Sequence, residues 1–208
     1  MLSDARSFFE RKIMDFALAL QSESVKEQST AAVFLRAKGA AGAPYLSRLL
    51  RCCMNVDTGS DRQLNKYEEE LLGYGAMTMG EIVRQVGFED SNDLHLKILD
   101  WIVASTDSRN PNIAAHSIWG LGLLGARHHR AINCLNRIIQ AELRPIEHEV
   151  VTFRSIALRM LAMIDASLVF EHQSSQAWIE LRRALEWWQR ESPVEWLRDE
   201  LQWLPRAE

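Results

Sequence analysis

The stretch from residue 110 to residue 142 constrains the fold more than any other part of the chain. Asn110 is a residue type that caps helix N-termini, and Pro111 follows it in a first-turn position where the missing N–H costs nothing. The next apolar residues recur at helical spacing, as Ala114, Ile118, Leu121 and Leu124. Gly125 then stands where a left-handed C-cap would sit. The pattern predicts a short helix bounded by Asn110 and Gly125.

A second helix is predicted from His129 to Glu142. Its apolar residues fall on one face, namely Ala131, Ile132, Leu135, Ile138 and Ile139. Isolated helices shorter than about 12–15 residues are marginal in water, so neither helix is expected to be stable alone. The stretch therefore predicts a helical hairpin that stacks on neighbouring helices.

Composition indicates a folded chain without a membrane span. The 208 residues are 47% hydrophobic, which is enough to build a core. No apolar run approaches the roughly 20 residues that a membrane helix needs. The N-terminal residues include Asp4 and Glu10, where a signal peptide would be basic and then apolar. We therefore predict a cytoplasmic location and no membrane association.

The three cysteines are predicted to be reduced and mostly buried. Cys52 and Cys53 are adjacent, and Cys134 lies in a predicted helix. This number and spacing suit neither a disulfide framework nor a Cys-x-x-Cys metal site. We expect no metal and no cofactor.

The charge of the chain disfavours nucleic acid as a partner. The formal net charge is −4 at pH 7, whereas proteins that bind phosphates present clustered lysine and arginine. After Lys97 every basic residue is an arginine, the commoner cation of protein interfaces, although codon bias would give the same composition. A protein or an acidic peptide is the partner class that remains.

An internal repeat is indicated by a shift of 86 residues, which aligns a predicted hairpin over 24–54 with the hairpin described above. The aligned pairs are Ala32 with Ile118, Leu35 with Leu121, Gly39 with Gly125, Leu46 with Ile132, Leu49 with Leu135, Cys52 with Ile138 and Cys53 with Ile139. If one repeat is about 40 residues long, then 86 residues are two periods. The region between the two copies should therefore hold a further, degenerate unit.

That intermediate region is predicted to contain two helices, Gln63–Leu72 and Asn92–Ala104. The acidic run Glu68–Glu70 is expected to form a solvated face. Three glycines follow in Gly73–Gly80, but this segment lacks the lysine and the preceding strand of a phosphate-binding loop. We expect a break or a close helix crossing there.

The C-terminal third supplies a further copy, in which Arg154, Ala157, Leu161, Ile164 and Asp165 follow one another at characteristic spacing. Here the chain resembles the HEAT-repeat family of helical hairpins, although the acid comes one position earlier than in that family. The resemblance implies an all-α fold, a right-handed α-solenoid of HEAT-like hairpins, whose second helices line a concave groove for partners. A single elongated domain over 1–208 is expected. It divides into a capping helix (1–22), repeats (24–54, 61–106, 110–142 and 146–190) and a C-terminal cap (193–204).

Candidate binding residues come from two groups. Arg51 and Arg137 are equivalent under the 86-residue shift and lie opposite the apolar stripes of their helices. With Arg183, and with Arg190 beside it, they are predicted to line one concave face that meets an acidic peptide or protein. Solvated surface arginines are the alternative.

The second group consists of tryptophans near the C-terminus. Trp187, Trp196 and Trp203 fall off the apolar stripe or beside it, and exposed tryptophan is favoured at interaction hot spots. They predict a partner surface or a homodimer surface, with sealing of the end of the stack as the alternative.

No motif supports catalysis. The adjacent His128 and His129 cannot both face one metal from a helix, and Glu147-His148-Glu149 suits a helix start. A protein-interaction scaffold, adaptor, regulatory or inhibitor protein is therefore the predicted function. One alternative is an enzyme on this architecture, since HEAT-like stacks include bilin lyases, which need a deep apolar cleft, and alkylpurine DNA glycosylases, which need a basic groove. The other alternative is a self-associating structural module.

Overall fold

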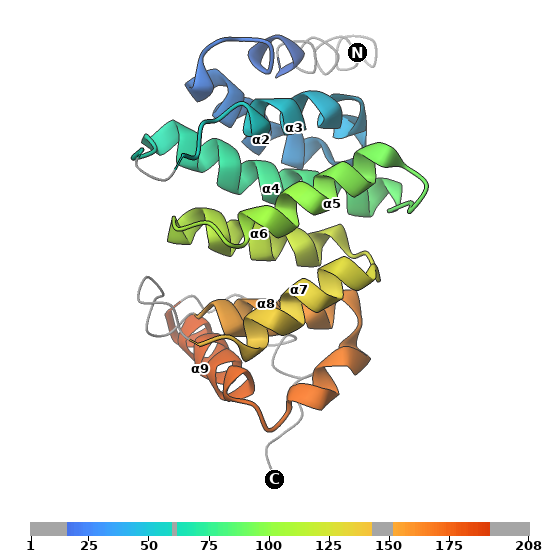
Figure 1. Cartoon of the computed structure of the whole chain (residues 1–208), viewed down its shortest axis with the longest axis vertical. Helices are drawn as coiled ribbons and strands as arrows, with labels where there is room; N and C mark the ends of the chain where they lie inside the picture. The colour runs from blue at the N-terminus through green and yellow to red at the C-terminus, as the bar shows by residue number, and fades with distance from the viewer. Residues whose placement is uncertain (1–15, 60–61, 143–151, 192–208) are drawn as a thin grey trace, which may run out of the picture. The chain divides into compact units, whose positions relative to one another are not determined.

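The computed structural model describes residues 16–59, 62–142 and 152–191, and over these ranges it contains helices and no strand (Figure 1). The all-α prediction is thereby confirmed. The helices are α2 (Val25–Lys38), α3 (Leu46–Met54), α4 (Lys66–Val86), α5 (Asp93–Ser105), α6 (Pro111–Leu124), α7 (His129–Gln140), α8 (Phe153–Ile164) and α9 (Gln176–Glu191). Two 3₁₀ helices, η1 (Gly39–Tyr45) and η2 (Ala166–His172), lie between them.

The contacts of the chain cluster into two compact units, Met1–Ala126 and Arg127–Glu208. The boundary falls in the connection between α6 and α7, so the two helices of the predicted hairpin belong to different units. The single domain, its repeat boundaries and the right-handed solenoid stay predictions. None of the helices in the described ranges is long and apolar enough to cross a membrane.

Both ends of α6 are as predicted. The Asn110 side-chain oxygen accepts hydrogen bonds from the backbone N–H groups of Asn112 at 3.0 Å and Ile113 at 3.2 Å. Gly125 adopts the left-handed conformation with φ 65°, and its N–H donates to the Gly122 carbonyl. Every member of the predicted stripe is buried. Helix α7 ends at Gln140, two residues before the predicted end.

In the first unit, α2, α4 and α6 lie side by side and run in the same direction (Figure 1). From α2 to α4, Ser29 donates to the Glu70 carboxylate, and further along the Thr78 hydroxyl donates to the Ala32 carbonyl at 2.9 Å. From α4 to α6, Gly73 faces His116 and Gly80 faces Gly120. Residue numbers rise together on each pair of helices, so the helices are parallel and α4 and α6 begin at the same edge of the unit.

The predicted helix end at Leu72 is wrong, because α4 continues through the glycine-rich segment to Val86. The other prediction for this segment was a close helix crossing, and the glycines form such a crossing with α6. A Cβ at Gly120 would lie 2.8 Å from the Ala76 carbonyl oxygen, and a Cβ at Gly80 would overlap the Gly120 carbonyl. Backbones approach this closely only where side chains are absent. Helices α4 and α6 therefore pack with their backbones in direct contact.

The acidic run at the start of α4 is only partly a solvated face. Glu68 is buried, because its carboxylate accepts hydrogen bonds from the Asn65 backbone N–H at 2.8 Å and from the Arg62 guanidinium. Together with the Asn65 side chain it completes a capping box for α4. The prediction of a solvated face is wrong for Glu68. Glu69 and Glu70 are half-buried.

In the second unit, α8 packs against both α7 and α9. A nearly buried ion pair joins α8 to α9, in which Arg154 donates twice to the Glu180 carboxylate. The Thr152 hydroxyl donates to the same carboxylate at 2.6 Å. Ala157, Leu161 and Ile164, which carry the HEAT resemblance, are buried. Arg154 is thus a tie between two helices.

Candidate functional site

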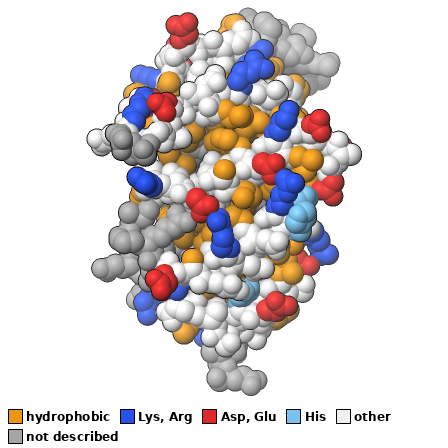
Figure 2. All heavy atoms as spheres, viewed as in Figure 1, with side chains coloured by type: hydrophobic (Ala, Val, Ile, Leu, Met, Phe, Trp, Pro, Cys, Tyr) orange, Lys and Arg blue, Asp and Glu red, His pale blue; other side chains and the backbone are white. Residues whose placement is uncertain are grey.

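The first unit has an open cavity where α3 and α5 end. Both helices pack on α4, but they hardly touch one another. A cavity of about 830 Å³, open to the surface, lies between these helix ends and the first turns of α4 and α6. We call it the α3–α5 cleft. Figure 2 shows hydrophobic side chains gathered on the face where α3 and α5 lie.

The lining of the α3–α5 cleft combines an apolar floor with a polar rim. Its apolar side chains are Cys53, Met54, Val56, Leu64, Leu72, Trp101, Ala104, Pro111 and Ile113. Its polar and charged side chains are Thr58, Arg62, Gln63, Glu69, Ser105, Asp107, Ser108, Arg109 and Asn110. Met54, at the end of α3, is 65% exposed. Contiguous exposed apolar patches are typical of interaction sites.

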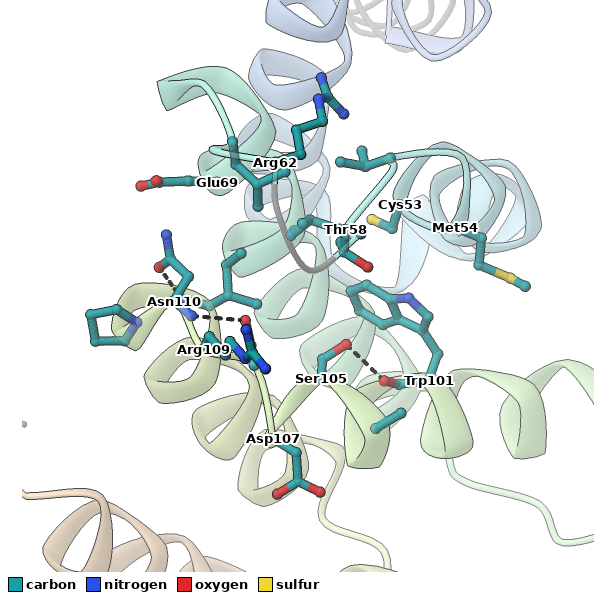
Figure 3. A pocket seen from close by; sticks show the side chains of 18 of the residues that line it. Cys53, Met54, Thr58, Arg62, Glu69, Trp101, Ser105, Asp107, Arg109 and Asn110 are labelled. Atoms are coloured by element: carbon teal, nitrogen blue, oxygen red, sulfur yellow. Dashed lines mark hydrogen bonds between the residues drawn. The ribbon is translucent and has the colours of Figure 1, made fainter. Parts of the chain in front are cut away.

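Local hydrogen bonds hold the two loops that flank the cleft. On one side, Arg62 donates to the Asp57 carbonyl at 3.0 Å and pairs with Glu68. On the other, the Ser105 hydroxyl donates to the Trp101 carbonyl at 2.8 Å and the Ser108 hydroxyl accepts from the Asn110 N–H (Figure 3). The Ser105 bond lies within the last turn of α5, and the Ser108 bond lies in the connection that leads to the cap of α6. Trp101 lies in this last turn of α5 and lines the cleft.

The charged groups of the cleft are directed differently. In Figure 3 the Arg109 side chain lies among the lining side chains, beside Asn110 and Ser105, whereas the carboxylates of Glu69 and Asp107 point outward. The guanidinium of Arg62 is engaged by Glu68. Arg109 is exposed, and in the described part of the chain it forms no hydrogen bond or ion pair. Of the two arginines in the lining, Arg109 is therefore the one left to pair with an anionic group of a ligand.

The thiol at the floor is not arranged for nucleophilic chemistry. Burial raises the pKa of the Cys53 thiol well above its usual range, and the same cause raises the pKa of Cys52. Only the thiolate is nucleophilic, so both groups are inert at neutral pH. All three cysteines are free and buried, which confirms the prediction of reduced core residues.

A smaller cavity of about 310 Å³ lies next to the cleft, and Glu69 lines both. Its other lining residues are Lys66, Glu70, Gly73, Tyr74, Asn112 and His116. The His116 Nδ1 lies 2.6 Å from the Asn112 carbonyl, and the imidazole packs edge-on against the Tyr74 ring at 5.3 Å. The described residues include no cluster of histidine, cysteine, aspartate or glutamate that could hold a metal ion.

The predicted arginines do not lie in the cleft. Arg51 is exposed on α3, one turn before Met54, in the first unit. Arg137 and Arg183 are exposed on α7 and α9, in the second unit, and Arg137 donates to the Cys134 sulfur at 3.7 Å. One concave face through all three stays a prediction.

The predicted tryptophan surface is described only in part. Trp187 is half-buried on α9. The side chain of Arg190 and the whole of Trp196 and Trp203 lie outside the described residues. The partner or dimer surface at this end stays a prediction, as do the roles of these residues.

The sequence did not predict that the lining residues form a cleft. Met54 and Arg109 stand in no motif, and Trp101 carried only the signal of a tryptophan at the edge of an apolar stripe. The cleft arises because chain segments around positions 54, 62, 101 and 109 meet in the fold. Comparison of the chain with protein-family models, with curated proteins and with solved structures finds no match.

Proposed function

We propose that this chain is a non-catalytic protein-interaction module, an adaptor or regulatory protein that binds a segment of a partner protein in the α3–α5 cleft. The observation that carries this proposal is the open cavity of about 830 Å³ with an apolar floor and an exposed Met54 at its edge. A volume of this size falls within the roughly 300–1,000 Å³ of ligand-binding sites.

The composition of the cleft favours a protein segment as the ligand. Tryptophan, methionine and arginine are enriched in protein interfaces, and the cleft presents Trp101, Met54 and Arg109 together. Methionine is flexible and polarisable, so it adapts to the shape of a bound side chain. The inert thiol of Cys53 fits a binding role better than a catalytic one.

The packing of the first unit supports the HEAT-like part of the proposal. Thr78 bonds Ala32, 46 positions earlier, and Gly80 meets Gly120, 40 positions later. These two steps together span the 86-residue spacing found in the sequence. We propose that α2, α4 and α6 are the first helices of successive hairpins in a right-handed α-solenoid. In such a stack the second helices, here α3 and α5, would line the groove for the partner.

The proposal is tested with a library of random peptides displayed on phage and selected against the full chain. We expect enrichment of a peptide family that binds the wild-type chain and fails to bind Met54→Glu, which places a charge at the edge of the cleft. Because Met54 is 65% exposed, the variant should keep its circular dichroism spectrum.

The matched control is Met163→Glu, the same substitution at a methionine on α8 that is 43% exposed and lies in the second unit. This variant should bind the selected peptides with wild-type affinity in fluorescence anisotropy. Absence of any enriched peptide, or equal binding to Met54→Glu and wild type, would contradict the proposal.

A further inference from the structure

Arg109 is one of the two arginines that line the α3–α5 cleft. It stands in the short connection between α5 and α6, and in the described ranges no carboxylate or carbonyl partner holds its guanidinium. The other arginine of the cleft, Arg62, has two partners, the Asp57 carbonyl and Glu68. Arg62 therefore stabilises the loop before α4 and the capping box, whereas Arg109 forms no such contact within the described ranges.

The charged residues around Arg109 carry both signs, but they are directed differently. The carboxylates of Glu69 and Asp107 point away from the lining group, as Figure 3 shows. The positive end of the α6 dipole lies directly after Arg109, although Asn110 already accepts from the first free N–H groups. An anionic group that enters the cleft would therefore meet the Arg109 fork without displacing an internal ion pair.

The apolar part of the cleft lies beside this positive group. Trp101, Leu72 and Ile113 line the same cavity as Arg109. A ligand that satisfies both parts carries an apolar side chain and a carboxylate a short distance apart. A guanidinium group pairs with a carboxylate through bidentate hydrogen bonds, and these charged hydrogen bonds are shorter and stronger than neutral ones.

We propose that the partner segment carries an aspartate or glutamate next to an apolar residue. Its carboxylate pairs with Arg109, and its apolar side chain lies on the floor of the cleft against Trp101. This inference rests on the proposed function, because it names the chemistry of the segment that the cleft binds. A nucleic acid is the poorer occupant, since the rim also presents Glu69 and Asp107 to a long polyanion and the net charge of the chain is −4.

The test is a charge exchange between the chain and the selected peptides. In the wild-type pool we expect aspartate or glutamate to be enriched at one position next to an apolar residue. Binding of such a peptide should weaken by up to about fivefold in Arg109→Gln, which is the upper range for a largely exposed ion pair. Arg109→Glu should bind weakly to the same peptide and should recover when the acidic residue of the peptide is replaced by lysine.

The matched control is Lys97→Glu, which makes the same change of charge at an exposed residue of α5 outside the cleft lining. It should leave peptide affinity and acidic preference unchanged. The lysine peptide should bind Arg109→Glu and should not bind Lys97→Glu. If the gain came only from the changed net charge of the protein, both variants would bind the lysine peptide.

Three results would overturn the inference. One is a selected pool that loses binding in Met54→Glu but shows no acidic preference, which would leave the proposed function standing. Another is equal weakening by Arg109→Gln and Lys97→Glu. The third is binding of a single-stranded oligonucleotide that depends on Arg109 and excludes the peptide. If no peptide is selected at all, the proposed function fails together with the inference.

Discussion

The crossing of α4 over α6 gives the sharpest stability prediction, in the variant Gly80→Ala. A Cβ at residue 80 would lie 3.2 Å from the Gly120 carbonyl carbon and closer still to its oxygen. These are backbone atoms of a buried helix, so they cannot turn away as a side chain would, and the two helices must move apart. Overpacking of this kind costs about 1–3 kcal/mol, and we take the upper value because the clash is with backbone. Alanine recovers about 1 kcal/mol of helix propensity relative to glycine.

The net loss in the free energy of unfolding is then about 2 kcal/mol, which corresponds to a fall of about 4–8 °C in the thermal midpoint of a chain of this size. Circular dichroism measures that midpoint. Gly73→Ala is the control in the same helix, since its Cβ would lie 3.2 Å from the half-buried His116 side chain, which can adjust. It gains the same propensity, so its midpoint should not fall. Equal midpoints for Gly80→Ala and Gly73→Ala would refute the argument that the crossing is closed by the absence of a side chain.

Three further predictions concern groups buried in the two units. Glu180→Ala leaves Arg154 without its partner in a nearly buried site, so the free energy of unfolding from urea titration should fall by about 3 kcal/mol, more than for the exposed Glu186→Ala. Burial lowers the pKa of His95, whose Nδ1 accepts from the Glu89 N–H, so the folded chain binds this proton less readily than the unfolded chain. Stability from this source is present above about pH 6.5 and is lost as the pH falls below it; the urea midpoint of His95→Gln should depend less on pH in that range. Finally, Cys52, Cys53 and Cys134 should react with a thiol reagent only as fast as the chain opens, so an added subdenaturing concentration of urea should speed the reaction, and rapid labelling in its absence would contradict their burial.

The parts of the fold that could be predicted from the sequence are those encoded by neighbouring residues. The ends of α6 follow from Asn110, Pro111 and Gly125, because caps and left-handed turns select residue types within a few positions. The apolar stripe of α6 was correct for the same reason, and that of α7 was correct except at Ile132, which is half-buried. The burial of Glu68 was not predictable from composition, since an acidic run at a helix start reads as solvated until Arg62 and Asn65 are seen to close on it.

The long-range features depend on which segments meet, and single-chain periodicity does not carry that information. Three glycines in Gly73–Gly80 are as compatible with a helix break as with a crossing, and only the approach of Gly120 decides between them. The α3–α5 cleft is of the same kind. Its floor depends on α3 and α5 each packing on α4 without closing on one another, and Arg109 reaches it from a loop whose sequence has no motif.

The same close crossing that excludes a side chain at Gly80 also aligns the first turns of α4 and α6 at one edge, and that alignment leaves Arg109 beside the cleft. Stability at the crossing and binding in the cleft should therefore be linked: a peptide that binds the cleft should raise the thermal midpoint of the wild-type chain, and its affinity should fall in Gly80→Ala more than in Gly73→Ala.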